Sequence, residues 1–475
     1  MKLVKTYSQQ ILRAVTSAVA LSALVLSGCG SGMVSSITGG TLITSTHNTD
    51  TQALITDAPA DKVLCLSVTV DSIRLYNAAG NYAEVLTTPA RIDASHLDAV
   101  QEPLREPLKI PQDTYTSASI TVENPVVAYV DSTGKVVRTA ATLTSGVDVV
   151  TFASPITVTS TSAPISFDLL VGQSVNISGT TVSVTPTFNV TTIPLASSPT
   201  HGGNGKVSDI QGTVVSTSGT TLVIQIASGA QIKIATDAHT EFQGFASLSA
   251  LTAGQLVEAD VAVQPDGSLL ALRIHLCPPN VGNLLTGPVT ALSGSPLIGF
   301  TMVLRQPLGP GVGTTSLGAP YAITVNSSTT YAISARVGTL PALPFPALFS
   351  AAKLSLGQNV QVGASAVNAT AATATAATVT LEPQTIGGTV ASLSTASGLT
   401  TYTVTLPANS ALGTLTGATS VVVYVAANSQ MATSTPIAVG STVRFNGLLF
   451  NDAGTLRLVT VECHDGPPSA PPQRH

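Results

Sequence analysis

Short runs of alternating apolar and polar residues, separated by turn-forming residues, dominate the chain beyond its N-terminal segment. Leu64 to Leu75 alternates with one irregularity, and the runs at 117–122 and 126–130 follow the same pattern. Alternation of period two is typical of β-strands that bury one face. Asp131 to Gly134 predicts a turn into a further strand that begins at Lys135. Because no segment sustains a period of 3.6 residues, the pattern predicts an all-β protein.

Residues 53–192 carry roughly eight to ten such runs with turns about every 8–12 residues, which is typical of a β-sandwich. We therefore expect an N-terminal antiparallel β-sandwich in this range. The residues on either side, 29–52 and 193–204, are rich in Gly, Ser and Thr and predict a flexible tether and a linker.

Beyond the linker the sequence repeats three times. Each unit opens with Gly-x-Val and carries Leu/Ile-x-x-Gly-x-x-Val in its second half. The openings begin at Gly212, Gly287 and Gly388, and the second motifs begin at Leu251, Leu354 and Ile437. We expect glycine at a sharp turn and alternating residues that enter a small barrel, which predicts three OB-like β-barrel repeats.

The second unit departs from the other two by two insertions, Gly309 to Pro320 and Val337 to Pro346. The latter is rich in Pro and Leu and predicts either a loop or the apolar lining of a groove. The full predicted organisation is a signal peptide at 1–28, a tether at 29–52, a β-sandwich at 53–192, a linker at 193–204, β-barrel repeats at 205–279, 280–384 and 385–464, and a disordered Pro-rich tail at 465–475.

Composition narrows the functional classes. Only 9% of the residues are charged and the net charge is −5, while residues 201–475 hold nine basic against ten acidic side chains and the chain has no Trp. A basic groove with stacking aromatic side chains is what single-stranded nucleic acid requires, so we expect no nucleic-acid partner. The shortage of aromatics also weakens a sugar-stacking platform, and the partner is left open as a protein or a glycan.

Titratable groups are concentrated in the first domain. Between Asp50 and Asp168 lie 14 of the 24 carboxylates, whereas 276–381 contains no Asp, Glu or His. General acid–base catalysis needs a titratable group within reach of the reacting proton, so that stretch alone predicts scaffold or binding surface. No Gly-x-Ser-x-Gly elbow is present, and His96 near Asp93 and Asp98 is typical of a solvated surface group.

Two sets of residues are candidate metal ligands. Asp57 and Asp61 flank a Pro-containing turn, and Asp93 lies in the same domain, as do Asp71, Asp98 and Asp113. A Ca²⁺ site needs six to eight oxygen ligands, and no D-x-D-x-D-G loop is present, so Asp57 is more simply a turn former. We expect no cofactor.

The second set consists of soft-metal ligands. His275 and Cys277 lie two residues apart, and Cys463, His464 and Asp465 are consecutive, but no C-x-x-C or H-x-x-x-H spacing supports a site. A disulfide between Cys277 and Cys463 is a further possibility, and Cys65 is expected to be a small buried hydrophobe.

The N-terminus predicts a membrane anchor. Lys2, Lys5 and Arg13 precede an uncharged 13-residue run, 14–26, which is too short to cross a bilayer but suits a secretory signal. Leu26-Ser27-Gly28-Cys29 resembles a bacterial lipobox, which implies cleavage before Cys29 and acylation of that residue. Gly30 is not Asp, which resembles the class of lipoproteins sorted to the outer membrane. The expected location is therefore the bacterial cell envelope, and the first partner is the membrane, through the N-terminal lipid.

Further resemblances cover most of the mature chain. Residues 54–59, Val68-x-Val70-x-x-Ile73, Ile92-Asp93 and Ile110-Pro111 leading to Thr114-Tyr115 resemble domain of unknown function 4382 over about 53–192. The three repeats resemble domain of unknown function 5666. Neither resemblance implies catalytic residues, so we expect a non-catalytic protein with an interaction or surface-architecture role. The alternatives are an envelope enzyme or metal-dependent binding protein that uses carboxylates of the first domain, and polysaccharide binding by the barrels.

Overall fold

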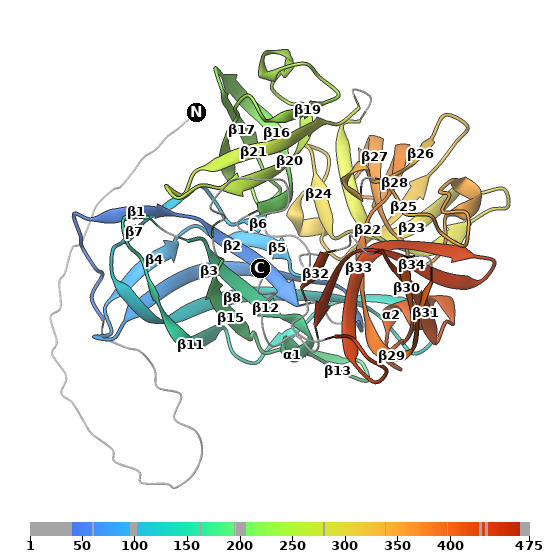
Figure 1. Cartoon of the computed structure of the whole chain (residues 1–475), viewed down its shortest axis with the longest axis horizontal. Helices are drawn as coiled ribbons and strands as arrows, with labels where there is room; N and C mark the ends of the chain where they lie inside the picture. Colours follow the sequence, from blue (N-terminus) through green and yellow to red (C-terminus); the bar gives the residue numbers. More distant parts are fainter. Residues whose placement is uncertain are drawn as a thin grey trace, which may run out of the picture. The chain divides into compact units, whose positions relative to one another are not determined.

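The computed structural model describes residues 40–58, 61–95, 102–161, 163–193, 195, 206–278, 281–337, 339–396, 398–426, 430–432 and 436–465. They all belong to one compact unit. The predicted signal peptide, the predicted lipidation site at Cys29 and residues 466–475 of the predicted tail fall outside the description. The described elements are 34 strands, two short α-helices and four 3-10 helices (Figure 1), which confirms the all-β class. None of the helices in this described part has the length and apolar character that a bilayer crossing requires.

The N-terminal domain contains two main sheets. One has the order β11 (Val147–Thr157), β8 (Thr114–Val130), β3 (Val63–Asn77) and β4 (Tyr82–Leu86), with β5 (Ala90–Asp93) on β3 and β9 (Val136–Ala140) on β8. The other has the order β15 (Phe188–Thr192), β12 (Ile165–Leu170), β2 (Ala53–Ala58) and β6 (Glu102–Pro103). Smaller sheets are β10 (Thr142–Leu143) with β14 (Thr181–Val184) and β13 (Val175–Ser178), and β1 (Asn48–Thr51) with β7 (Leu108–Pro111); α1 covers Val171–Ser174.

The two main sheets share one apolar core. Val68 and Ile120 of the first sheet and Ile55 and Phe167 of the second belong to the same buried cluster, as in a β-sandwich. The hairpin predicted at Asp131 joins β8 to β9, which pair antiparallel, and Gly134 has a φ of +83° at the turn. The sequence pattern therefore located both the strands and this connection.

Two features of this domain differ from the sequence prediction. The sandwich is not purely antiparallel, because β2 and β12 pair parallel. Only strands joined by a tight turn must be antiparallel, and these two are separated by most of the domain. The predicted tether is also too long, since β1 lies inside 29–52 and pairs with β7. Backbone hydrogen bonds order this wholly polar strand, which carries no apolar alternation.

Three further sheets close on themselves, and we call them ring 1, ring 2 and ring 3. Ring 1 contains β16 (Lys206–Ser218), β17 (Thr221–Gln225), β18 (Gln231–Ala235), β21 (Leu269–Leu276) and β20 (Leu256–Val263); β19 (Glu241–Gln243) adds to β21, and η1 covers Leu248–Ala250. Ring 2 contains β22 (Asn283–Ser293), β23 (Gly299–Val303), β25 (Pro320–Thr324), β28 (Thr373–Leu381) and β27 (Asn359–Asn368); β24 (Gln306–Leu308) adds to β22 and β26 (Thr330–Ile333) to β28. Ring 3 contains β29 (Gln384–Ala396), β30 (Leu399–Thr405), β31 (Ser420–Ala426), β34 (Thr455–Asp465) and β33 (Thr442–Asp452); β32 (Gln430–Ala432) adds to β34, and α2 covers Ala411–Thr416.

The five strands of each ring are connected in the same way. The first strand pairs with the second and the fourth, and the third pairs parallel with the fifth. All three sheets are thus cyclic and share one strand order. Each ring holds its own apolar cluster, with Ile224, Phe300 and Phe445 among the buried members.

The two repeated sequence motifs contact each other in every ring. The motif glycines pair with the valines of the second motif as Gly212 with Val257, Gly287 with Val360, and Gly388 with Val443. A turn glycine then donates its N–H to the carbonyl of the opening valine: Gly254 to Val214 at 2.9 Å, Gly357 to Val289 at 2.8 Å, and Gly440 to Val390 at 2.8 Å. The three turn glycines have φ of +89°, +79° and +90°, which is the conformation expected of glycine at a sharp turn.

The two insertions of ring 2 pack against neighbouring units. The first includes η2 (Thr314–Ser316) and places Leu317 in a buried cluster with Leu64 and Cys65 of the N-terminal domain. The second follows η3 (Ala335–Val337), precedes η4 (Ala351–Lys353), and places Phe345 in a cluster with Tyr424 and Phe450 of ring 3. Of the two alternatives for the second insertion, it is a loop whose apolar side chains cover ring 3.

Candidate functional site

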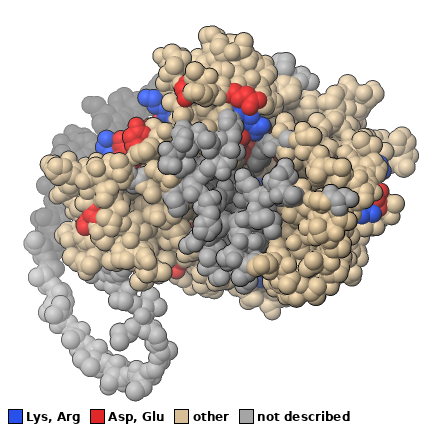
Figure 2. Space-filling view, in the orientation of Figure 1, with Lys and Arg blue, Asp and Glu red and all other residues tan. Residues whose placement is uncertain are grey.

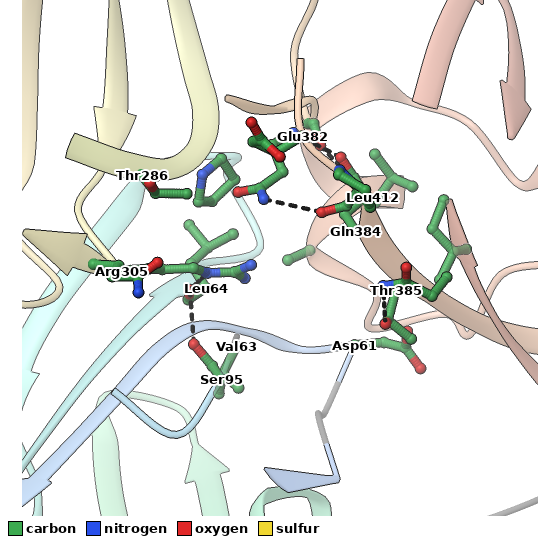
Figure 3. A pocket seen from close by; sticks show the side chains of 18 of the residues that line it. Asp61, Val63, Leu64, Ser95, Thr286, Arg305, Glu382, Gln384, Thr385 and Leu412 are labelled. Carbon is green, nitrogen blue, oxygen red and sulfur yellow. Dashed lines mark hydrogen bonds between the residues drawn. The ribbon is translucent and has the colours of Figure 1, made fainter. Parts of the chain in front are cut away.

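A pocket with both polar and apolar lining lies where the N-terminal domain and all three rings meet (Figure 3), and we call it the junction pocket. Its volume is about 130 Å³. The lining side chains used below come from the N-terminal domain (Asp61, Leu64 and Ser95), ring 1 (Asp209 and Gln211), ring 2 (Thr286, Arg305, Asn359 and Glu382) and ring 3 (Gln384, Ile386, Leu412 and Arg444). The pocket therefore exists only when these four units are in contact.

The N-terminal domain is attached to the pocket through its backbone and Asp61. Asp61 Oδ1 accepts the N–H of Gly387 at 3.1 Å, and the Asp61 carbonyl accepts the N–H of Ala411 at 2.6 Å. Ser95 Oγ donates to the carbonyl of Leu64 at 3.2 Å. Two of these residues, Asp61 and Gly387, are 326 positions apart in the chain.

Gln211 and Thr286 occupy the same position in ring 1 and ring 2, directly before the motif glycine. Gln211 is 5% exposed, and its Nε2 donates to Glu258 Oε1 and to Asp209 Oδ1, both at 3.3 Å. Thr286 is 7% exposed. Within the described part of the chain, neither Gln211 Oε1 nor Thr286 Oγ1 has a hydrogen-bond partner.

Asn359 is held by a set of bonds from the segment that links ring 2 to ring 3. Its N–H donates to Gln384 Oε1 at 2.6 Å and its Nδ2 to the Pro383 carbonyl at 3.1 Å, while Gln384 Nε2 donates to the Gly357 carbonyl at 2.9 Å. Asn359 is 9% exposed, and no described residue donates to its Oδ1. The side chain is thus fixed in orientation with an acceptor left over.

Arg305 supplies positive charge from ring 2. Its Nε donates to the carbonyl of Leu64, and the side chain extends from the ring 2 side toward the middle of the pocket (Figure 3). Arg444 also lines the pocket, together with the carboxylates of Asp61, Asp209 and Glu382. Both signs of charge are present, so the site does not select strongly for a cation or an anion. Charged side chains are few and scattered on the face drawn in Figure 2.

The predicted carboxylate site is only partly brought together. Asp61 lines the junction pocket, but Asp93 is buried in the N-terminal domain, where its Oδ1 accepts the N–H of Leu66 at 2.9 Å and the hydroxyl of Ser95 at 2.9 Å. Asp57 lies on β2, but its side chain falls outside the description, as do His96 and Asp98. Asp113 accepts Asn77 Nδ2 at 2.9 Å. Among described residues no group of three or more His, Cys, Asp or Glu is placed to hold a metal.

The predicted soft-metal residues also have other contacts. Cys277 is a buried free thiol, so the structure does not contain the considered Cys277–Cys463 disulfide. Burial raises the pKa of Cys277, and the charges of Glu258 and Asp209 raise it further. His275 Nδ1 lies 3.5 Å from Glu258 Oε2. The side chains of 461–465, which include Cys463, His464 and Asp465, fall outside the description.

Sequence reasoning did not select Gln211, Thr286 or Asn359. Each lies beside a motif glycine, Gln211 and Thr286 just before one and Asn359 two positions after Gly357. A signal was therefore available, because neighbouring residues of a repeated turn recur at corresponding places on the rings.

Comparison with known proteins extends to ring 1. Residues 211–275 match the family model described as domain of unknown function 5666, a range that begins at Gln211 and spans most of ring 1. A search of curated proteins finds no match. Part of this chain is thus similar to a family that has no assigned activity.

Proposed function

We propose that this protein is a non-catalytic, lipid-anchored component of the bacterial cell envelope that acts as a binding and architectural module. The observation that carries the proposal is the junction pocket, to which all four units contribute side chains. A site that needs every unit gives a reason for their covalent linkage and for the apolar clusters that hold ring 2 against its neighbours.

The chemistry of the best-placed reactive groups favours binding over catalysis. Asp93 is committed to the Leu66 backbone and the Ser95 hydroxyl. The thiols of Cys65 and Cys277 are buried, and burial raises the pKa of both, which disfavours the thiolate needed for nucleophilic attack. These groups have stabilising roles in our proposal.

The envelope location rests on the N-terminal sequence. Lys2, Lys5 and Arg13, the uncharged run that follows, and Cys29 support export and acylation, and Gly30 supports outer-membrane sorting. Several acyl chains together anchor a protein where one binds only marginally. The resemblance of 53–192 to domain of unknown function 4382, common in bacterial lipoproteins, supports the same location.

The anchor is tested on the full chain expressed in a Gram-negative host. Mass spectrometry of the mature N-terminal peptide should find Cys29 as the first residue, carrying acyl groups. Cys29→Ser should move the protein from the membrane to the soluble fraction, whereas Cys277→Ser should leave it membrane-bound. An unmodified Cys29 in the mature protein contradicts the anchor.

The binding role is tested by screening small molecules from envelope extracts against the purified full chain. We expect at least one to raise the melting temperature, because a ligand that binds only the folded state stabilises it. The bound molecule should be recovered chemically unchanged. Its conversion to a product would contradict the non-catalytic proposal, and the absence of any stabilising molecule would contradict the binding proposal.

A further inference from the structure

We propose that the junction pocket binds one compact, uncharged, hydroxyl-rich ring of the size of a single sugar unit. This inference rests on the proposed binding function and adds the chemical class of the ligand. It concerns the space between the rings rather than the outer face of any one barrel.

Three residues that line the pocket each carry a buried oxygen atom that can accept a hydrogen bond. Gln211 Oε1, Thr286 Oγ1 and Asn359 Oδ1 are each at least nine-tenths buried and have no hydrogen-bond partner among the described residues. Burying a polar atom without a partner costs free energy, so each such group points to a donor that the protein does not supply. The residues that carry these three oxygens line one pocket, and a ligand with several donors would satisfy them.

The orientation of the two amides is determined by their bonds. Gln211 Nε2 faces two carboxylates, and a carboxylate cannot donate to an amide oxygen. Asn359 Nδ2 donates to the Pro383 carbonyl. In both side chains the nitrogen is therefore the atom turned toward the protein acceptors, and the oxygen has no donor among the described residues.

Arg305 lines the same pocket and supplies hydrogen-bond donors. Arg305 directs its guanidinium group toward the middle of the pocket (Figure 3), while its Nε is used by the Leu64 carbonyl. A ligand must then accept hydrogen bonds as well as donate them. A hydroxyl group does both. An inorganic anion without a proton would leave the Gln211 and Asn359 amide oxygens unpaired, and a simple cation could not accept a hydrogen bond from Arg305.

Size and lining complete the assignment. A volume of about 130 Å³ is roughly tenfold what one water requires, which corresponds to about ten to twelve non-hydrogen atoms in a compact ring. Leu64, Ile386 and Leu412 contribute apolar surface for the C–H groups of such a ring. None of the described residues that line the pocket is aromatic, so recognition depends on enclosure and hydrogen bonds rather than on stacking.

The test measures binding to the full-length protein by isothermal titration calorimetry. The panel contains free hexoses, pentoses and alditols, with zwitterionic amino acids and inorganic phosphate as competing classes. Thr286→Val removes the unpaired hydroxyl while preserving shape. It should weaken sugar binding about threefold to tenfold, the value of one hydrogen bond.

Thr290→Val is the matched control. Thr290 lies on the same strand, outside the pocket, and its Oγ1 donates to the Thr301 carbonyl at 3.3 Å. This variant should bind sugars as the wild type does. Equal weakening by both substitutions would indicate a general effect on ring 2 and overturn the assignment.

The outcomes separate this inference from the proposed function. Sugar binding that Thr286→Val alone weakens supports both, whereas binding of acyclic alditols with no sugar bound overturns the ring and leaves the binding function intact. Binding of amino acids or phosphate, with no sugar bound, overturns the ligand class but leaves the binding function intact. If no member of the panel binds and the broader extract screen also fails, both are overturned and the pocket contains only solvent.

Discussion

Ring 1 and ring 2 share one strand order and the same contacts between their two motifs, yet they contact their surroundings differently. Ring 1 follows the repeated pattern without long insertions. Ring 2 carries two, one of which packs on the N-terminal domain and the other on ring 3. The comparison shows that the motifs specify the ring itself, whereas residues outside them specify its neighbours.

Alanine substitution of the motif glycines should produce the largest difference between ring 1 and ring 2. A Cβ on Gly287 would overlap the backbone carbonyl of Val303, whereas one on Gly212 would meet the Ile224 side chain, with its Cβ at 2.7 Å. Neither the Val303 carbonyl nor the Ile224 Cβ can rotate away, but the overlap at Gly287 is the deeper of the two. We expect Gly287→Ala to lower the free energy of unfolding by about 3 kcal/mol or more and Gly212→Ala by about 1–3 kcal/mol, measured by urea denaturation. Equal losses would contradict the difference.

The insertions can be tested at Phe345. Its ring lies 5.5 Å from that of Tyr424 and 5.7 Å from that of Phe450 of ring 3, and Arg457 lies 5.2 Å above it. Phe345→Ala should cost about 3 kcal/mol of unfolding free energy, measured by the same denaturation. Leu348, two residues beyond the insertion, is 62% exposed, and Leu348→Ala should change stability by less than about 0.5 kcal/mol. A comparable loss of stability in both variants would contradict a specific stabilising contact between Phe345 and ring 3.

Two thiols report on the two sides of ring 2. Cys65 belongs to the cluster between the N-terminal domain and ring 2, and Cys277 to the cluster between ring 1 and ring 2. Burial raises the pKa of both, with Asp93 adding to the effect at Cys65. At pH 8 we expect alkylation slower than in urea by roughly two orders of magnitude or more, since each pKa unit removes a factor of ten in thiolate. Peptide mass spectrometry measures the rate, and rapid labelling of either thiol in the native protein would contradict its burial.

The smallest expected effect is a pH dependence of stability that differs between two equivalent turns, one in ring 1 and one in ring 2. In ring 1 Asp237 Oδ1 accepts the N–H of His239 at 2.8 Å, and in ring 2 Asn326 Oδ1 accepts the N–H of Ser328 at 2.9 Å. Mainly through that backbone bond, the pKa of Asp237 is lowered from the ordinary 3.8. Its contribution to stability is present above that ordinary value and is lost as the pH falls through the lower, folded pKa.

Asp237→Asn should therefore flatten the acid limb of the melting temperature slightly, without altering the fold, because asparagine serves the same turn in ring 2. Thermal melts between about pH 2 and 6 measure the effect. Asn326→Asp is the matched variant and should introduce a similar pH dependence. An unchanged acid limb in both variants would show that these turns do not couple to unfolding.

Local chemistry was readable from the sequence, and contacts between units were not. The alternation predicted the strands, and the glycines at 254, 357 and 440 have the positive φ that their turns require. The parallel pairing of β2 with β12 was missed because strand order is set by the whole chain. The junction pocket was missed for the same reason. Asp61 is hydrogen-bonded to Gly387, 326 positions away, and the local sequence around neither residue predicts this contact.

Strand β2 has a consequence for any attempt to divide this protein. Ile55 packs in the sandwich core, while its neighbour Leu54 packs in the apolar cluster of ring 1 with Ile210 and Ile224. Strand β2 thus contributes side chains to two separate hydrophobic cores. A fragment that starts at residue 205 would lack Leu54 and expose part of an interior to solvent, so truncation would invite aggregation. A recombination event that separated the sandwich from ring 1 would expose the same apolar residues, so we expect the two to be exchanged together during evolution.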